Sequence, residues 1–185
     1  MKRLMIVALS ALMSVNAFAL FSETEPNNTR ATADMVIYNL RSTPPFAEVG
    51  VLNLTQNDSD FFKIRLNAGD YLTAITFPIN NPPNDPDTVM ALFDASGTTA
   101  IVSNDDANGL GSAIRWLATT SGDYYIAITG YHGSVGQSQL SYYEGISHAE
   151  VGPYILTVSV VPEPASMIAL GTGLAGLVAL RRRRK

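Results

Sequence analysis

The sequence of 185 residues has no cysteine and only two histidines, His132 and His148. Without cysteine the chain can form neither a disulfide framework, nor a thiol nucleophile, nor a cysteine-based zinc site. Basic residues are scarce between Leu20 and Pro162, where five of them stand against 15 acidic residues and give this part a net charge of −10. A nucleic-acid-binding domain needs a basic face, so we expect no nucleic-acid partner.

The common catalytic motifs are also missing from the sequence. It contains no G-x-S-x-G nucleophile elbow, no H-E-x-x-H zinc motif and no glycine-rich phosphate loop. The acidic residues cluster in polar turns, whereas a catalytic carboxyl pair needs one member with a raised pKa in an apolar cleft. Both histidines lie in a glycine-rich stretch and would serve a serine triad only if folding set one against a serine and an aspartate. We therefore predict that the protein is not an enzyme.

The N-terminus has the three parts of a secretory signal peptide. A basic start, Met1–Arg3, precedes Leu4–Val15, a run that is apolar except for two serines. Ala17 and Ala19 then supply the small residues of a cleavage site. The run is too short for a membrane-spanning helix. We predict a signal peptide over residues 1–19, with a buried N-terminal helix as the alternative.

The C-terminus has the features of a membrane anchor. Residues 165–180 carry no charge, and the five residues 181–185 are all basic. At about 1.5 Å per residue the uncharged segment makes roughly 24 Å of helix, slightly less than the hydrocarbon core of about 30 Å, and the terminal arginines can extend it by snorkelling. We predict a transmembrane helix over 165–180 with its Arg-rich end in the cytoplasm.

A Pro-Glu-Pro motif stands directly before this segment, at Pro162, Glu163 and Pro164. The motif, the apolar segment and the Arg-rich end, together Val161–Lys185, resemble the PEP-CTERM sorting signal of Gram-negative bacteria. The resemblance implies that an exosortase, a membrane protease-transpeptidase, recognises Pro162, Glu163 and Pro164 and processes the chain near them. It also implies transient anchoring in the inner membrane, followed by transfer to the cell surface or the extracellular polysaccharide matrix.

Between the two ends we predict one all-β domain, residues 20–160. Short runs rich in β-branched and aromatic residues alternate with Gly, Pro, Asn and Asp, which is typical of strands and turns. The predicted strands are Met35–Leu40, Ala47–Leu54, Phe61–Leu66, Tyr71–Phe77, Thr88–Asp94, Ala100–Ser103, Ala113–Ala118, Tyr124–Thr129 and Tyr154–Val160. Eight or nine short strands at this spacing favour a jelly-roll-like β-sandwich over a meander. In the long stretch Tyr131–Gly152 we expect a mobile loop, with a further strand near Gln139–Tyr143.

A second resemblance covers nearly the whole domain, from about Ser22 to Val160. The segments that carry it are Glu23–Thr29 (ETEPNNT), Asp58–Ile64 (DSDFFKI), Leu66–Asp70 (LNAGD), Leu92–Asp94 (LFD), Asn104–Asp106 (NDD) and Gly122–Ile126 (GDYYI). Together they resemble the bacterial pre-peptidase C-terminal (PPC) domain. That family implies a jelly-roll sandwich that is usually appended to secreted peptidases and is related to the collagen-binding domains of collagenases. The stretch Tyr131–Gly152 is longer than the family pattern.

Oxygen-bearing side chains are concentrated near the start of the domain. Ca²⁺ takes six to eight oxygen ligands, more than one flexible segment can supply, so a partner loop is needed. The predicted calcium site consists of Glu23, Glu25, Asn27, Asn28, Asp58 and Asp60. The PPC resemblance implies the same kind of site, with Glu23, Glu25, Asn27 and Asp60 at the matching positions. The alternative is that Asn27-Asn28 forms a turn and the acids are solvated.

A second candidate cation site lies in the stretch Asn104–Gly109. Its members are Asp85, Asp87, Asn104, Asp106 and Asn108. The last three match the first ligand positions of an EF-hand-type loop, but Arg115 stands where the closing glutamate should be. An Asx-rich turn is the alternative.

Tyr142 and Tyr143, in the long loop, are the candidate ligand contacts of the domain. We therefore predict a non-catalytic exported protein with a calcium-binding β-sandwich, sorted to the cell surface or the polysaccharide matrix. An accessory module that binds a secreted protein or glycan through these tyrosines is the first alternative. A hydrolase with an unrecognised site is the second.

Overall fold

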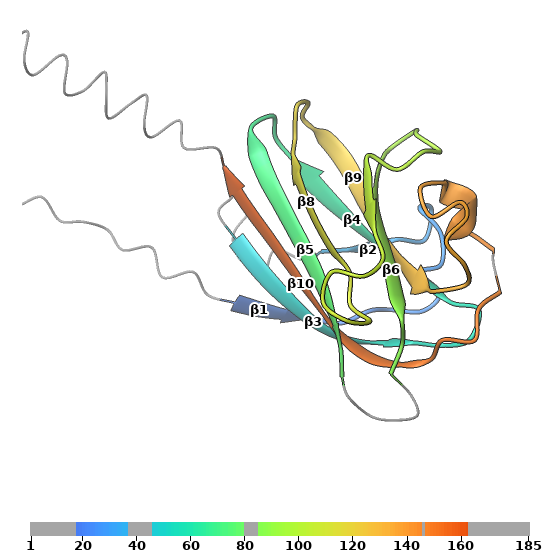
Figure 1. The fold of residues 1–185 in the computed structure, drawn as a ribbon. Coiled ribbons are helices and arrows are strands. Elements are labelled where there is room, and N and C mark those ends of the chain that lie inside the picture. Colours follow the sequence, from blue (N-terminus) through green and yellow to red (C-terminus); the bar gives the residue numbers. More distant parts are fainter. Residues whose placement is uncertain (1–17, 37–45, 80–84, 146, 163–185) are drawn as a thin grey trace, which may run out of the picture.

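The protein is described from a computed structural model (Figure 1) that covers residues 18–36, 46–79, 85–145 and 147–162. The predicted signal peptide up to residue 17, the predicted transmembrane segment 165–180 and the Arg-rich end lie outside the described residues. Within the described ranges, no helix has both the length and the apolar character needed to cross a membrane.

Ten strands form two five-stranded sheets that pack as a sandwich (Figure 1). The first sheet has the order β1 (Phe18–Phe21), β3 (Phe46–Leu54), β10 (Gly152–Pro162), β5 (Asp70–Pro78) and β8 (Ala113–Leu117). The second has the order β2 (Asp34–Met35), β4 (Ser59–Leu66), β9 (Gly122–Gly130), β6 (Thr88–Asp94) and β7 (Val102–Asn104). The predicted all-β sandwich is thus confirmed.

Eight of the nine predicted strands have a counterpart whose ends differ by no more than two residues. The exception is the predicted strand Met35–Leu40, of which only the start coincides with β2, and residues 37–40 lie outside the described part. Strand β1 was not predicted. It spans the expected cleavage position after Ala19, so that cleavage there would leave only Leu20 and Phe21 of this strand.

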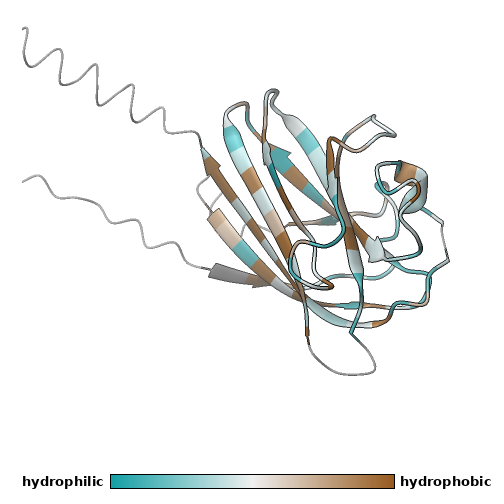
Figure 2. Ribbon diagram, viewed as in Figure 1, coloured by the Kyte–Doolittle hydropathy of each residue, from teal (hydrophilic) through white to brown (hydrophobic). Residues whose placement is uncertain are grey.

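The core forms because alternate residues of each strand face the opposite sheet. In β10 the inward residues Tyr154, Leu156, Val158 and Val160 are fully buried, while the residues between them are partly exposed. The hydropathy colours alternate accordingly along the strands of the first sheet (Figure 2). The period-two patterns in the sequence therefore identify the core residues correctly.

The chain changes sheets at almost every connection. Among the described strands, β6 and β7 are the only consecutive pair joined by a ladder, and all other ladders join strands that are distant in sequence. The turn after β6 starts at Asp94, whose side chain accepts hydrogen bonds from the backbone N–H groups of Ser96 and Gly97. A meander is therefore excluded, as the strand spacing predicted.

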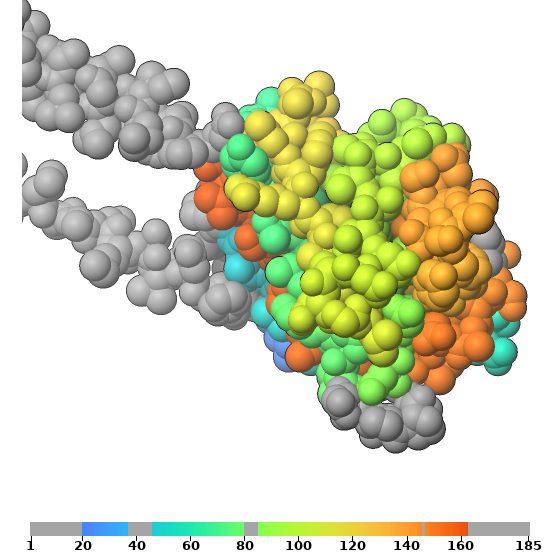
Figure 3. All heavy atoms as spheres, in the orientation of Figure 1, coloured from blue at the N-terminus to red at the C-terminus, as the bar shows by residue number. Residues whose placement is uncertain are grey.

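The long loop 131–151 packs against the outer face of the second sheet (Figures 1 and 3). Instead of the predicted strand at Gln139–Tyr143 it contains a 3₁₀ turn, η1 (Leu140–Tyr142). The loop buries Leu140 against Phe61 and Phe93 of the sheet. Because both faces of the second sheet are covered, six consecutive residues of β6 are buried, which is the pattern of a strand between two layers.

Tyr142 and Tyr143, the predicted ligand contacts, are buried between the loop and the second sheet. Their exposed fractions are only 3% and 1%, respectively. Tyr143 packs edge-on against Phe93, with ring centroids 5.5 Å apart, and its hydroxyl donates a hydrogen bond to the backbone oxygen of Gln137. Both rings belong to the apolar cluster between the loop and the second sheet. The burial of their aromatic surface holds the loop against the sheet.

A buried polar network joins the two sheets at one end of the sandwich. The Ser112 hydroxyl lies 2.5 to 2.9 Å from the backbone oxygens of Thr88, Asn104 and Asp105, and Ser112 is fully buried. Its backbone N–H donates to the hydroxyl of Thr76 in β5. Ser112 thus links the loop between β7 and β8 to the second sheet through its hydroxyl and to the first sheet through its backbone N–H.

Replacing Ser112 with alanine should destabilise the protein because it removes the only side-chain donor that these carbonyl oxygens have in the network. We expect a loss of about 1–3 kcal/mol in the free energy of unfolding, measured from urea unfolding curves. Ser134→Ala is the control, since Ser134 is exposed and such substitutions change stability by less than about 0.5 kcal/mol. Equal stability of the two variants would contradict the role of the network.

Candidate metal centre

The segment between β1 and β2 crosses from the first sheet to the second. It does so because β1 pairs with β3 and β2 pairs with β4. The backbone oxygen of Asn27 accepts a hydrogen bond of 3.0 Å from the N–H of Phe61, which fastens the segment beside the start of β4. The crossing therefore brings the acidic residues of the N-terminal segment close to Asp60.

Three predicted calcium ligands meet at this crossing. Carboxylate oxygens of Glu23, Glu25 and Asp60 lie within 4.8 Å of one another. The fold holds one oxygen of Glu23, because its Oε1 accepts a hydrogen bond of 2.8 Å from the backbone N–H of Asn53. It also holds one oxygen of Asp60, whose Oδ2 accepts a hydrogen bond from the hydroxyl of Tyr154.

Glu25 Oε2 accepts a hydrogen bond of 3.2 Å from the backbone N–H of Asn27, but four other oxygens at this crossing have no hydrogen-bond partner among the described residues. Glu23 Oε2 and Asp60 Oδ1 are buried and accept no hydrogen bond, and the same is true of Oδ1 of Asn27 and Asn28. Asn27 is fully buried. Native proteins rarely leave buried oxygens without a partner, so this cluster is suited to a ligand that supplies positive charge or donors.

The pKa values of the carboxylates also indicate that the cluster suits a positively charged ligand. Burial, reinforced by Glu25, Asp58 and Asp34, raises the pKa of Glu23 from 4.5 to about 7. Burial also raises the pKa of Asp60 well above its usual value, with Glu23 as the largest charged contributor. Ionised carboxylates without a counter-charge are costly in such a site. The site favours either protonation or a bound cation.

Asp58, another predicted ligand, has a structural role in this conformation. Its Oδ2 accepts hydrogen bonds from the N–H and hydroxyl of Thr55, and its Oδ1 accepts one from the N–H of Ser59. Both oxygens are therefore occupied, and Asp58 lies outside the group of three carboxylates. It acts on the site through its charge, which raises the pKa values of Glu23 and Glu25.

Asp34, in β2, is a member of the site that the sequence analysis missed. Its Oδ2 accepts hydrogen bonds from the N–H of Thr24, at 2.6 Å, and from the side-chain amide of Asn27, at 3.4 Å. It stands alone in the sequence, without neighbouring ligand residues. Only the pairing of β2 with β4 brings it to the cluster, so no local pattern could have indicated it.

His148 ties the long loop to the same end of the sandwich. Its Nε2 lies 2.6 Å from the backbone oxygen and 3.0 Å from the backbone nitrogen of Asp58. The ring packs so closely on Gly130 that a Cβ there would come within 2.4 Å of Nδ1. Nδ1 of His132 lies 2.8 Å from the oxygen of Gly130. Each of these histidine contacts is with the backbone, not with a serine hydroxyl.

The second predicted cation site is only partly assembled. Asp87 and Asp106 do come together, and they are joined by Asp105, so that oxygens of the three lie within 4.8 Å of one another. Asn104 is committed elsewhere, since its Oδ1 accepts a hydrogen bond of 2.9 Å from the N–H of Ala113. The EF-hand-like alternation is therefore not formed, because this loop folds back on itself through the bridge between Asn108 and Gly111.

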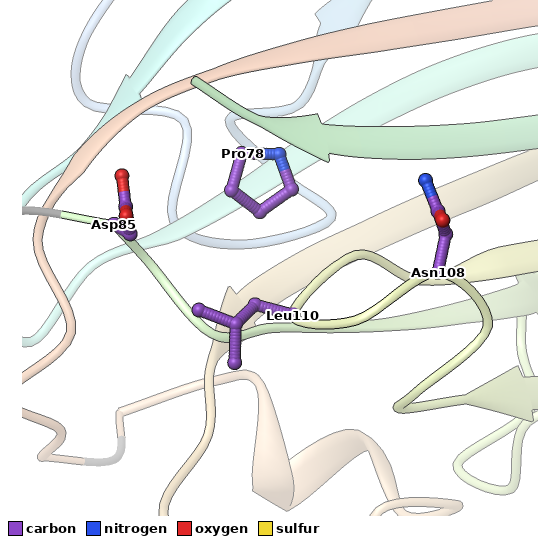
Figure 4. A pocket seen from close by; sticks show the side chains of 4 residues that line it. All are labelled: Pro78, Asp85, Asn108 and Leu110. Atoms are coloured by element: carbon purple, nitrogen blue, oxygen red, sulfur yellow. The ribbon is translucent and has the colours of Figure 1, made fainter. Parts of the chain in front are cut away.

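The remaining two members of that prediction lie beside a surface hollow. The hollow has a volume of about 170 Å³ and is lined by Pro78, Asp85, Asn108 and Leu110. Asp85 and Asn108 stand on either side of Pro78 and Leu110 (Figure 4). Neither belongs to the group of three carboxylates around Asp87.

Two family models match parts of this sequence. The family model of the bacterial pre-peptidase C-terminal domain matches residues 58–130, and that of the PEP-CTERM protein-sorting motif matches residues 160–184. Parts of this chain are therefore similar to the PPC domain and to the PEP-CTERM sorting motif. The PPC match starts at Asp58, so the N-terminal part of the metal centre lies before it.

One curated relative is a probable subtilase-type serine protease from Deinococcus radiodurans, 30% identical over 105 residues. These residues make up 57% of this chain but only 14% of the protease.

Two solved structures are similar to this domain. The periplasmic inhibitor of g-type lysozyme from Aeromonas hydrophila has a TM-score of 0.47 and 15% identity, covering 78% of this chain and 99% of the inhibitor. The PPC domain of a Bacillus anthracis collagenase has a TM-score of 0.40 and 11% identity, covering 78% of this chain and 95% of that domain.

The raised pKa of Glu23 predicts how the metal-free protein responds to pH. The folded state binds this proton more tightly than the unfolded state, so the stabilisation is complete below the unfolded pKa of 4.5 and is lost as the pH rises through about 7. Asp60 acts in the same direction. In excess EDTA we expect the melting temperature to fall from about pH 5 to about pH 8 and Glu23→Gln to flatten this fall.

Asp123→Asn is the matched control for this titration. Hydrogen bonds from Lys63 and Arg65 lower the pKa of Asp123, so the residue is ionised in the folded and unfolded states across this range. The control should therefore keep the pH slope of the native protein. A slope that Glu23→Gln leaves unchanged would contradict the assignment.

Proposed function

We propose that the protein is a non-catalytic exported module that binds Ca²⁺ at Glu23, Glu25, Asn27 and Asp60 and is sorted by an exosortase-type system. Its destination in this proposal is the cell surface or the extracellular polysaccharide matrix. The domain would be a jelly-roll-like sandwich that travels with a signal peptide over residues 1–19 and a transient transmembrane helix over 165–180.

The observation that carries the calcium assignment is the set of buried oxygens without a partner around Asp60. The available donors are carboxylate and amide oxygens, which are hard ligands and suit Ca²⁺ better than a transition metal. Asn28, next to Asn27 in the sequence, would be a secondary member of the site, and Asp58 would act on it through its charge. A cation would compensate the repulsion that raises the pKa values of the carboxylates.

The sorting assignment rests on the PEP-CTERM match over residues 160–184. An exosortase-type enzyme is the partner that this motif implies, with Pro162, Glu163 and Pro164 as its recognition residues. The net charge of −10 between Leu20 and Pro162 opposes direct binding to an acidic polysaccharide. Attachment to such a matrix would therefore use calcium as a bridge or depend on processing of the tail.

The alternatives have less support. A binding module that uses Tyr142 and Tyr143 loses its surface, because both rings are buried. A hydrolase would need a nucleophile activated by a base. His132 contacts the backbone oxygen of Gly130, and His148 contacts that of Asp58. These contacts do not support a role as the base for either histidine.

Calcium should stabilise the purified protein against heat. A ligand at about 100 times its Kd adds roughly 2.7 kcal/mol to the free energy of unfolding, which raises the melting temperature of a protein of this size by roughly 5–10 °C. Scanning calorimetry in EDTA and in excess calcium measures the shift. We expect Glu25→Gln to abolish most of it, since Glu25 is exposed and its replacement should not disturb the core.

Two variants separate this site from other acidic groups. Asp123→Asn removes a carboxylate that is paired with Lys63 at 2.8 Å, and Asp87→Asn removes one from the second cluster. Both should keep the calcium shift. A native protein whose melting temperature does not respond to calcium would show that the carboxylates around Asp60 do not bind it.

The sorting motif should control release of the protein from the membrane. In a host with an exosortase-type system, we expect Glu163→Ala to leave the precursor unprocessed in the membrane fraction, while Ser166→Ala is processed like the native chain. Immunoblots of fractionated cells distinguish the longer precursor from the product. Normal processing of Glu163→Ala would show that the motif is not the recognition element.

A further inference from the structure

The segment Glu23–Asn27, which carries most of the proposed calcium ligands, is fastened by one oxygen of Asp34. Asp34 Oδ2 accepts a hydrogen bond of 2.6 Å from the backbone N–H of Thr24, which lies between the two glutamates of the segment. The same oxygen accepts a hydrogen bond of 3.4 Å from Nδ2 of Asn27. One carboxylate oxygen therefore holds this short segment at two points.

The contact with Asp34 determines which end of the Asn27 amide is available to a cation. An ionised carboxylate only accepts hydrogen bonds, so it pairs with the NH₂ group of an amide and repels the amide oxygen. With Nδ2 on Asp34, Oδ1 of Asn27 is directed away from that carboxylate, and this oxygen is buried without a hydrogen-bond partner among the described residues. An amide turned the other way would present a donor in its place.

The position of Asp34 is itself fixed by the second sheet. Asp34 is paired with Phe62 and Met35 with Lys63 in the parallel ladder between β2 and β4. The backbone N–H of Val36 donates a hydrogen bond of 3.0 Å to the oxygen of Lys63, and Val36 is fully buried in the main core. Asp34 can therefore serve as a fixed point for the segment that precedes it.

Asp34 differs from the proposed ligands in its place and in its effect. It lies outside the group of three carboxylates whose oxygens are within 4.8 Å of one another. Its charge nevertheless contributes to the raised pKa values of Glu23 and Glu25. Without a cation this charge repels the two glutamates, whereas with a cation bound it adds to the attraction. Removing it should therefore affect the metal-free and the calcium-bound protein in opposite directions.

We propose that Asp34 is a positioning residue of the calcium site, which orients Asn27 and holds the segment Glu23–Asn27 in its binding conformation without being a ligand. This inference rests on the proposed function, and it adds the residue that assembles the ligand set. Since Asp34 belongs to β2, calcium affinity then depends on the pairing of β2 with β4. Replacing an outer partner of this kind typically weakens metal binding about 10- to 100-fold.

The Asp34→Asn variant tests this role in the purified full chain. The substitution keeps the size of the side chain, removes its charge and adds an NH₂ group, so the Asn27 amide is no longer held in one orientation. Calcium is titrated calorimetrically at about pH 8, above the pKa of about 7 of Glu23. We expect the Kd for calcium to rise about 10- to 100-fold.

The melting temperature of the same variant in EDTA separates positioning from a general structural role. We expect it to equal or exceed that of the native protein, because Glu23 and Glu25 lose a repelling neighbour. A variant that melts at a lower temperature in EDTA, or that does not fold, would show that Asp34 only supports the fold. A Kd within about threefold of the native value, well below the expected loss, would also overturn the inference.

A double-mutant cycle tests whether Asp34 acts through Asn27. Asn27→Ala removes the amide that Asp34 orients. In that background we expect Asp34→Asn to raise the Kd by a smaller factor than in the native chain, because only its charge and its contact with Thr24 remain to be lost. Equal factors in both backgrounds would contradict the proposed orientation of Asn27. The melting temperature in EDTA is measured for each variant.

Asp123→Asn is the matched control, since it removes one carboxylate at the other end of the ladder between β4 and β9. There Asp123 is paired with Lys63 and Arg65, and its replacement should leave the Kd for calcium unchanged. If the native chain does not bind calcium, the proposed function fails. If the native chain binds calcium and Asp34→Asn binds it equally well, only the role of Asp34 fails.

Discussion

The hydrogen bond from the hydroxyl of Tyr154 to the carboxylate of Asp60 connects the main features of this protein. Tyr154 lies in β10 of the first sheet and Asp60 in β4 of the second, and both are completely buried. The bond therefore crosses the core of the sandwich. It holds one oxygen of Asp60 and leaves the other facing Glu23 and Glu25, and the same β10 continues into the sorting motif.

The carboxylates around Asp60 lower the stability of the folded protein, and the rest of the domain offsets this loss. Three carboxylates lie within 4.8 Å of one another, where burial and mutual repulsion raise their pKa values. A buried charge without a partner lowers the free energy of unfolding. The packing of the strands around the site must offset this loss. Ladders on both sides of β10 and of β4 provide such a rigid frame.

The two faces of the sandwich differ because of the loop 131–151. This loop covers the second sheet with a small core of its own and is anchored through His148 to the start of β4. The first sheet has no such cover among the described residues, and it contains the strand that leads to the tail. The second sheet, which carries Asp60, is thus covered on both faces. The first sheet contains the strand that leads to the sorting motif.

The sequence by itself determined the all-β class, most strand positions, the sorting motif and the closeness of Glu23, Glu25 and Asp60. These depend on local patterns: a period of two, turn residues, and short motifs that family members share. Only the tertiary structure decided that Tyr142 and Tyr143 are buried, that Asp58 holds a turn and that Asp34 joins the site. Those outcomes depend on pairings between residues far apart in the chain, such as β2 with β4 and the loop with β6, which no local pattern encodes.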